Sequence, residues 1–166
     1  VMATLLRSAA LSGLGTTGTA ALLASFKPSN EDAEALSQSL MAFLPEIQFP
    51  APPKNRFDPD VSSIESDGFC ESLTALAIQT TSERPVLELV GMLEHANPAM
   101  RRSAIASLIS LGARAKPAIK ALVLVTVKDP DGQIRFGAER ALEKIRAELK
   151  AQELPGQPTI EGASNP

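Results

Sequence analysis

The single histidine and the single cysteine of this 166-residue chain are its candidates for reactive chemistry. His95 could act as a general base because an unperturbed imidazole titrates near neutral pH, and Cys70 could act as a thiol nucleophile. Either role requires a partner within hydrogen-bond reach that orients the reacting group. Glu94 adjoins His95 without a serine or cysteine elbow, and no motif places the histidine beside Cys70. We therefore predict no catalytic residue: His95 caps a helix end in a turn, and Cys70 packs in a helical core.

Clusters of acidic residues and of glycines could bind a cation or a nucleotide. Acidic residues gather at two places: Glu31, Asp32 and Glu34, and Asp58 with Asp60. Neither group has the spacing of a calcium loop, and one histidine with one cysteine cannot build the common zinc sites. Residues 13–18 fit the pattern G-x-G-x-x-G, but they follow a predicted helix instead of a strand, so helix termination explains these glycines. The sequence predicts no metal and no cofactor.

The composition excludes two classes of partner. A net charge of −3 and a pI near 5.2 leave no overall positive field to bind phosphates, so nucleic acid is not an expected partner. No apolar stretch approaches the roughly 18 residues of a membrane-spanning helix. Alanine and leucine supply most of the apolar mass, and the six aromatic residues are all phenylalanine, which favours close helix packing.

The N-terminal stretch 1–26 has some features of an export signal. Arg7 precedes apolar residues and 20–25 is apolar again, but glycines and threonines between 13 and 19 interrupt any continuous apolar segment. The chain begins at Val1 and within a predicted helix, so we interpret it as part of a longer polypeptide with further repeats or domains. The compartment stays open: the cytoplasm is the default expectation, and export would require a signal ahead of Val1.

Two segments repeat each other, and their period is the strongest structural signal. Residues 97–101 (Asn-Pro-Ala-Met-Arg) correspond to residues 131–135 (Asp-Gly-Gln-Ile-Arg). The number of residues from position 97 to position 131 is the period of the repeat. Apolar residues then recur at matching places: Ala104, Leu108 and Leu111 against Ala138, Leu142 and Ile145. A fixed period in this range is typical of a solenoid, in which each unit buries its apolar face only against its neighbours.

The region around this repeat is predicted to contain four helices: 84–95, 98–111, 116–127 and 132–149. Pro85, Pro98 and Pro117 suit first helical turns, where a missing N–H costs nothing. Asn97 is a good N-cap, and Gly112 is a good residue to end the second helix.

The array extends in weaker form toward the N-terminus. A shift of two periods aligns Ser29, Leu36, Leu40 and Phe43 with Asn97, Ala104, Leu108 and Leu111. Prolines between 45 and 59 exclude a regular helix there, and a helix resumes near Asp67. We therefore divide the chain into degenerate repeats at 1–44, a Pro-rich loop insertion at 45–66, further repeats at 67–149 and a disordered tail at 150–166.

Residues 97–112 and 129–145, the latter beginning Asp-Pro-Asp-Gly-Gln-Ile-Arg, resemble HEAT repeats, specifically the phycobilisome-lyase-type HEAT-like repeats. The resemblance implies an all-α fold: an α-solenoid, or armadillo-like α-α superhelix, of antiparallel helix pairs with the second helices on the concave side. It also implies that Arg101, Arg135 and Asp129 are framework residues that bond between neighbouring units. His95 departs from the pattern because it occupies the place of Asp129 one unit earlier, which should weaken the turn bonding there. Arg146 replaces the closing glycine, so the last helix should continue.

The outer surface of the second helices is the predicted partner-binding site. At helical spacing, Arg102, Ile105 and Ile109 share one face away from the core stripe, and Phe136, Glu139 and Glu143 occupy the equivalent surface of the next repeat. Two outward isoleucines favour contact with a partner, and continued packing against another repeat explains them equally well.

These features favour a non-enzymatic scaffold that binds a protein or peptide on its concave face through shape and a few buried anchors. Substituting Arg102, Ile105 and Ile109 together should then abolish binding and leave the helices intact. The alternative is a repeat domain of a modular enzyme such as a bilin lyase-like protein, which the resemblance suggests and no residue of this chain supports.

Overall fold

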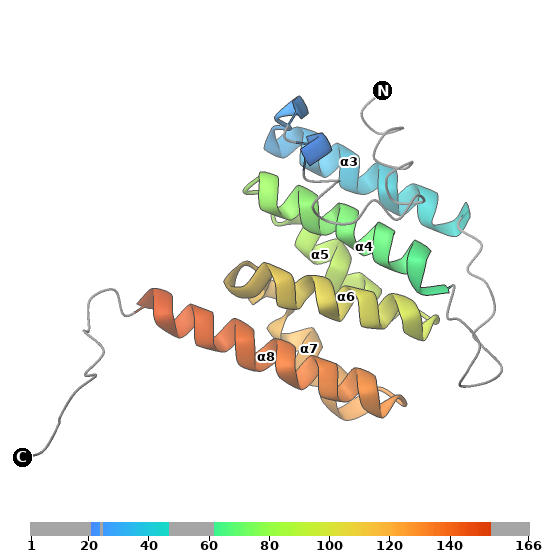
Figure 1. Cartoon of the computed structure of the whole chain (residues 1–166), viewed down its shortest axis with the longest axis vertical. Coiled ribbons are helices and arrows are strands. Elements are labelled where there is room, and N and C mark those ends of the chain that lie inside the picture. Colours follow the sequence, from blue (N-terminus) through green and yellow to red (C-terminus); the bar gives the residue numbers. More distant parts are fainter. Residues whose placement is uncertain (1–20, 24, 47–61, 154–166) are drawn as a thin grey trace, which may run out of the picture.

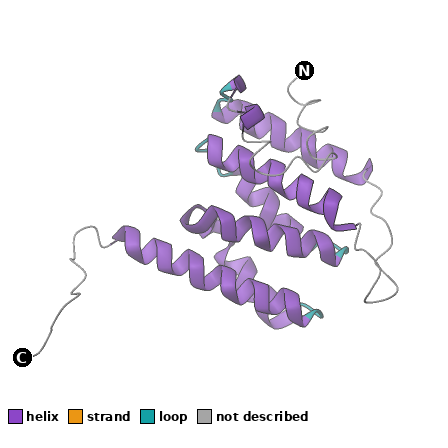
Figure 2. Cartoon of the chain, viewed as in Figure 1, coloured by secondary structure: helices purple, strands orange, loops and turns teal. Residues whose placement is uncertain are grey.

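The computed structural model describes residues 21–23, 25–46 and 62–153, and within these ranges the chain is helical without a strand (Figure 2). The prediction of an all-α fold is confirmed for this part of the chain. Short helical stretches lie at 21–23 and 25–26. The further elements are α3 (Asn30–Phe43), η1 (Leu44–Glu46), α4 (Ser62–Gln79), α5 (Arg84–Met92), α6 (Pro98–Leu111), η2 (Gly112–Ala118), α7 (Ile119–Lys128) and α8 (Gly132–Glu153).

Four helices lie side by side in one layer, in the order α3, α4, α6 and α8, and α5 and α7 lie behind them (Figure 1). Helix α4 packs between α3 and α6, and α6 packs between α4 and α8. Behind this layer, α5 contacts α3, α4 and α6, whereas α7 contacts α8. Each interior helix of the front layer is therefore covered on both sides and from behind.

One continuous apolar core runs through the whole stack. Its largest fully buried side chains come from both layers and from the short stretch 21–23: Leu23, Leu40, Phe69, Leu73, Leu76, Leu89, Met100, Leu108, Leu122, Ile134 and Ile145. The alanines of the predicted repeat, Ala104 and Ala138, are also fully buried. Small residues at these places let neighbouring helices approach closely, while leucine and isoleucine fill the space between the layers.

The helix starts follow the period seen in the sequence. Ser29, Asn97 and Asp131 precede α3, α6 and α8, with two periods between the first pair and one between the second. The hydroxyl of Ser29 accepts a hydrogen bond from the backbone N–H of Asp32 at 3.1 Å. The side chains of Asn97 and Asp131 each accept one from the N–H two residues further on, at 2.9 and 2.8 Å. All three are N-caps that satisfy otherwise unpaired donors at a helix start.

The helix ends differ from the prediction where the backbone tightens. Helix α5 ends at Met92 instead of 95, because the N–H groups of Leu93, Glu94 and His95 bond to carbonyls three residues back. Helix α7 begins at Ile119 instead of 116, after the 3-10 segment η2. Helix α8 runs to Glu153, in agreement with the expectation that Arg146 does not close it.

Two predicted boundaries shift as well. Helix α4 begins at Ser62, so it takes the last residues of the predicted insertion at 45–66, and α8 takes the first residues of the predicted tail at 150–166. Residues 1–20, 47–61 and 154–166, with the rest of the loop and tail predictions, lie outside the described residues. None of the described helices combines the length and apolar character needed to cross a bilayer.

Candidate functional site

The two candidate reactive groups occupy structural positions. Cys70 is fully buried in α4 with its Sγ atom 3.5 Å from the Sδ atom of Met100, and burial, with the nearby charges of Asp67 and Glu71, raises the pKa of this thiol. A neutral thiol without access to solvent is a poor nucleophile. The Nδ1 atom of His95 accepts a hydrogen bond from the backbone N–H of Asn97 at 3.1 Å. Burial lowers the pKa of His95, as does the charge of Arg101. The predictions of a core cysteine and a turn histidine are confirmed.

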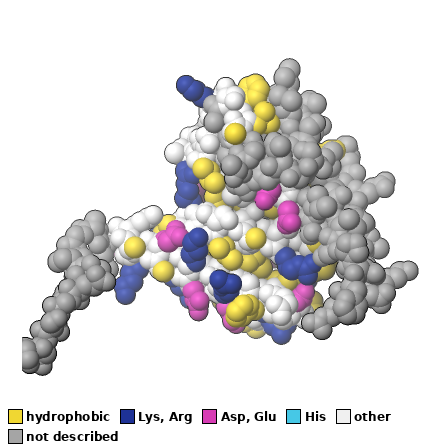
Figure 3. Space-filling model, viewed as in Figure 1, with side chains coloured by type: hydrophobic (Ala, Val, Ile, Leu, Met, Phe, Trp, Pro, Cys, Tyr) yellow, Lys and Arg dark blue, Asp and Glu magenta, His cyan; other side chains and the backbone are white. Residues whose placement is uncertain are grey.

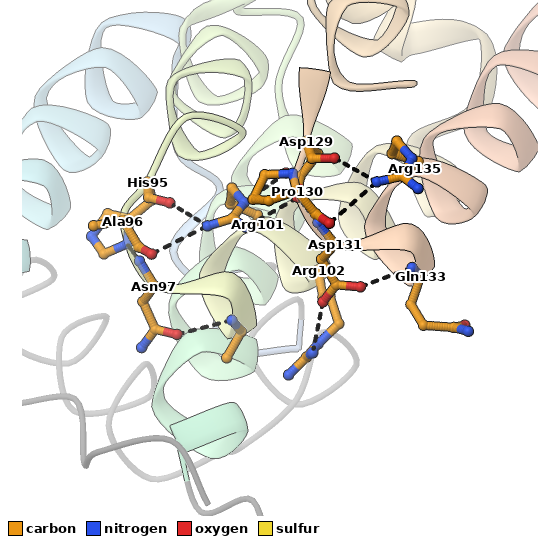
Figure 4. Close-up of polar contacts among 11 residues, drawn as sticks. His95, Ala96, Asn97, Arg101, Arg102, Asp129, Pro130, Asp131, Gln133 and Arg135 are labelled. Carbon is orange, nitrogen blue, oxygen red and sulfur yellow. Dashed lines mark hydrogen bonds and ion pairs between the residues drawn. The ribbon is translucent and has the colours of Figure 1, made fainter. Parts of the chain in front are cut away.

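The turn before α6 and the turn before α8 share one hydrogen-bond pattern (Figure 4). His95 accepts from the N–H of Asn97, and Asp129, one period later, accepts from the N–H of Asp131 at 2.9 Å. His95 keeps the local bond of this pattern, since its Nδ1 atom makes the bond that a carboxylate oxygen makes in the next turn. An imidazole nitrogen and a carboxylate oxygen are both acceptors at this reach.

The arginines that follow these turns repeat the same contacts. Arg101 donates from Nη1 to the carbonyls of His95 and Ala96, at 2.9 and 3.2 Å. Arg135 donates from Nη1 to the carbonyls of Asp129 and Pro130, at 2.7 and 3.2 Å. Each arginine therefore fixes the turn that precedes its own helix.

Arg101 also joins the two turns. Its Nε and Nη2 atoms donate to the two carboxylate oxygens of Asp129 at 2.8 and 3.1 Å, and the two side chains are 12% and 4% exposed. This fork-to-fork arrangement is the strongest geometry for a guanidinium and a carboxylate. The framework roles expected for Arg101 and Asp129 are thus seen as bonds between the α5–α6 turn and the α7–α8 turn.

Asp129 gives the fold a pH dependence of defined sign. Burial alone would raise the pKa of Asp129, but hydrogen bonds from Arg101 and the N–H of Asp131, with the charges of Arg101 and Arg135, hold it below its ordinary value. A lowered pKa in the folded state means that the carboxylate stabilises the fold above the unfolded-state pKa of about 3.9. We therefore expect the free energy of unfolding to fall as the pH drops below about 4.

Urea denaturation between pH 6 and pH 2.5 checks this expectation. The Asp129→Asn variant should be less stable at pH 6 and should lose less stability on acidification than the unsubstituted chain. Asp32 shares the lowered pKa, through hydrogen bonds from Ser29, but is fully exposed. The Asp32→Asn variant is therefore the matched control, and an equal flattening of the pH profile in both variants would contradict the assignment to Asp129.

A hollow of about 260 Å³ lies between α6 and α8 on the front of the layer. It is lined by Arg102, Ile105, Ala106, Ile109, Gln133, Ile134 and Gly137. The missing side chain at Gly137 opens this space, since a Cβ atom there would stand 3.5 Å from the Cγ2 atom of Ile105. The floor is apolar, and Arg102 and Gln133 supply the polar groups that line it.

The structure divides the six predicted partner-binding residues into two groups. Arg102, Ile105 and Ile109 meet in the α6–α8 hollow, where Arg102 is exposed and Ile109 is half-buried. Ile105, however, is only 3% exposed, because α8 covers it. The expectation of two outward isoleucines is wrong for Ile105, whose side chain packs against α8. A triple substitution that includes Ile105 would therefore disturb the fold as well as the surface.

The second group lies on α8 itself. Phe136 is 57% exposed, and Glu139 and Glu143 are exposed as well. These residues stand one period after Arg102, Ile105 and Ile109, so they present the same side of the next helix in the layer. Within the described residues no helix covers that side of α8 (Figure 1), and the two groups do not form one site.

Sequence reasoning missed two other hollows. One of about 80 Å³ lies between α4 and α6 and is polar, with the hydroxyl of Ser103 donating to the carboxylate of Asp67. Asp67 stands one period before Arg101, so a full alignment of α4 with the repeat would have singled it out. The other, of about 370 Å³, lies on the back between the end of α5 and α7, with Leu93, Leu124 and Lys128 among its lining residues.

No family model matches this chain, and neither a curated protein nor a solved structure gives a significant match. What the geometry offers is therefore the basis for a functional inference. The described residues contain no group of three or more His, Cys, Asp and Glu side chains that could hold a metal ion. The α6–α8 hollow, in contrast, combines apolar walls with a few polar groups, which is the usual makeup of a binding site.

Proposed function

We propose that this chain is a non-enzymatic binding scaffold, a stretch of HEAT-like α-solenoid that holds a protein or peptide segment on the front of its layer of second helices. The observation that carries the proposal is the hydrogen-bond set of the α5–α6 turn, which recurs one period later in the α7–α8 turn. A repeated framework of this kind makes a rigid extended surface, and such surfaces bind by shape.

The proposed binding surface spans α4, α6 and α8. Its central residue is Ala106, which is exposed and lines both the polar α4–α6 hollow and the apolar α6–α8 hollow. Figure 3 shows the α6 and α8 part of this face, with hydrophobic side chains visible over these helices and charged groups around them. Because Ala106 lines both hollows, a larger side chain at this position would affect both of them.

The chemistry of the two hollows describes the segment they would hold. The α6–α8 hollow fits one apolar side chain as an anchor, because Ile105, Ile109 and Ile134 line it. The α4–α6 hollow offers the Asp67 carboxylate and serine hydroxyls to a hydrogen-bond donor, such as a lysine or an amide. In many interfaces a few residues supply most of the binding energy. The apolar anchor and the neighbouring polar residue of the bound segment would have this role.

Other features support a role without catalysis. Cys70 is buried and its thiol is held neutral, and His95 is used as a hydrogen-bond acceptor in a turn. The Asp67 carboxylate accepts from Ser103, so this serine hydroxyl also has a structural contact. These contacts account for the candidate reactive groups through packing and turn formation alone.

A selection from a random peptide library displayed on phage tests the proposal with the purified chain as bait. We expect selected peptides to bind the Ala106→Arg variant about 30-fold more weakly, the loss typical of a substitution at a binding hot spot. A long charged side chain at this exposed position blocks both hollows without entering the core. Fluorescence anisotropy would give the dissociation constants, and circular dichroism would show that helicity is kept.

The matched control is Val127→Ser on α7, at a side chain that is 76% exposed on the back layer. This variant should bind the same peptides as tightly as the unsubstituted chain. If the selected peptides bound the Ala106→Arg variant as tightly as the unsubstituted chain but lost affinity for the Val127→Ser variant, the binding surface would lie on the back. That result would overturn the proposal.

A further inference from the structure

We propose that the outer side of α8 is a second docking surface, for a protein segment that carries a carboxylate for Arg135, an apolar side chain for Phe136 and basic groups for Glu139 and Glu143. This surface is separate from the front hollows. Each of its residues stands one period after a residue of α6. Those α6 residues contact α8 or the α7–α8 turn.

The first observation is the half-used guanidinium of Arg135. Arg101 bonds two carbonyls of its own turn through Nη1 and the carboxylate of the next turn through Nε and Nη2. Arg135 makes the same two carbonyl bonds through Nη1 (Figure 4), but among the described residues its Nε and Nη2 atoms have no hydrogen-bond partner. The guanidinium is thus oriented in advance for a bidentate carboxylate.

The second observation is the change of the residue beside it. Where Arg101 of α6 binds Asp129 of the α7–α8 turn, the next residue, Arg102, pairs with Asp131, two residues after Asp129. The Nη1 atom of Arg102 lies 3.8 Å from the Oδ2 atom of Asp131. At α8 the equivalent of Arg102 is Phe136, which is 57% exposed. The segment that suits Arg135 and Phe136 therefore has an acidic residue followed, two positions later, by an apolar residue.

The third observation concerns Glu139 and Glu143, which replace the isoleucines that α6 presents to α8. A further copy of the same apolar unit would bury these carboxylates without partners, which is strongly unfavourable. In the contact of α8 with α6, Gln133 and Gly137 line the hollow between the two helices. A partner segment with basic side chains at the places equivalent to these two residues would pair with Glu139 and Glu143. The charges thus exclude an identical repeat and specify a partner with a different sequence.

The length of α8 points to a partner that is not the directly following unit. Helix α6 stops at Leu111 because Gly112 adopts a φ of 54°, and the chain then turns back into η2 and α7. Helix α8 carries Arg146 at the equivalent place and continues to Glu153. The chain therefore does not turn back at Arg146 as it does at Gly112, so a next helix pair is not placed against α8 by the equivalent turn. We assign the surface to a segment of another polypeptide.

A peptide derived from the turn that Arg101 binds tests the proposal. The probe has the sequence of residues 127–140 with Asp131 replaced by Leu and with Gln133 and Gly137 replaced by Lys. Its control differs only by Asn in place of Asp129. We expect the control peptide to bind the full chain about tenfold more weakly, because one charged, bidentate contact is lost.

Variants of the full chain identify the site of binding. The Arg135→Gln variant should lose the preference for the aspartate peptide, and the Phe136→Ser variant should bind both peptides more weakly. Arg140→Gln on the same helix should leave the affinity for both peptides unchanged. Dissociation constants come from fluorescence anisotropy, and thermal melting shows that each variant is folded. Equal affinity of the two peptides, no binding of either, or an equal loss in Arg140→Gln would overturn the proposal. Arg135 and Phe136 do not line either front hollow, so the effect of these two variants is independent of the phage selection.

Discussion

The Asp129→Ala variant should unfold with a free energy about 3 kcal/mol lower than that of the unsubstituted chain. Asp129 accepts two hydrogen bonds from Arg101 and one from the backbone N–H of Asp131. Removal of the carboxylate leaves the largely buried Arg101 guanidinium without its counter-ion and leaves one turn N–H without its acceptor. Both losses are costly because the two side chains are shielded from water. Urea denaturation at pH 7 measures the change.

Two comparisons make this prediction specific. Arg102→Ala removes an exposed ion pair at 3.8 Å and should cost less than about 1 kcal/mol. A double-mutant cycle with Arg101→Ala and Asp129→Ala should give a coupling energy that accounts for most of either single loss. A coupling near zero would mean that the two turns are joined by packing alone, and the Arg101–Asp129 pair would then be a consequence of the fold instead of a cause.

The repeat period predicts the helices because it acts through local chemistry. A residue that caps a helix, such as Ser29, Asn97 or Asp131, needs only the next few backbone N–H groups, which the sequence itself supplies. Equivalent turns therefore form at equivalent positions wherever the capping chemistry is kept. The exchange of aspartate for His95 is harder to interpret from sequence, because its role depends on the acceptor atom and not on charge.

Contacts between helices are predicted less well. Periodicity shows which residues share a face of one helix, but the covering of that face depends on which helix lies beside it. Ile105 and Glu139 hold equivalent positions, yet α8 covers the first and no described helix covers the second. The pairing of Asp67 with Ser103 escapes pattern reasoning for a related reason. The proline-rich residues before α4 interrupt the sequence period and hide the correspondence of α4 with α6 and α8.

The short helix α7 shows a further limit of pattern reasoning. The sequence predicts that Pro117 opens a helix near 116, but Gly112–Ala118 forms a 3-10 segment and the α-helix starts at Ile119. The backbone N–H of Ala113 bonds to the Glu148 carboxylate of α8 at 2.9 Å, a contact between distant parts of the sequence. A tertiary bond of this kind fixes the path of the segment, and no local signal reveals it.

Replacing Ile105 with alanine should cost about 3 kcal/mol of stability, within the range for buried Ile→Ala substitutions. The side chain is 3% exposed and fills the space opposite Gly137, so its removal leaves a cavity between α6 and α8. Ile109→Ala, at the half-buried neighbour that lines the same hollow, should cost about 1 kcal/mol, because less apolar area returns to water. Urea denaturation of both variants gives the comparison.

The pair of variants also separates a structural isoleucine from a binding one. Under conditions where both proteins are fully folded, Ile109→Ala should weaken peptides selected on the front surface, since it removes part of the anchor wall. Ile105→Ala should act mainly through stability, and it enlarges the floor of the hollow without changing its exposed rim. If Ile105→Ala cost less than about 1 kcal/mol, the residue would behave as the sequence suggests, as an outward side chain, and the packing of α8 on α6 would have to be reconsidered.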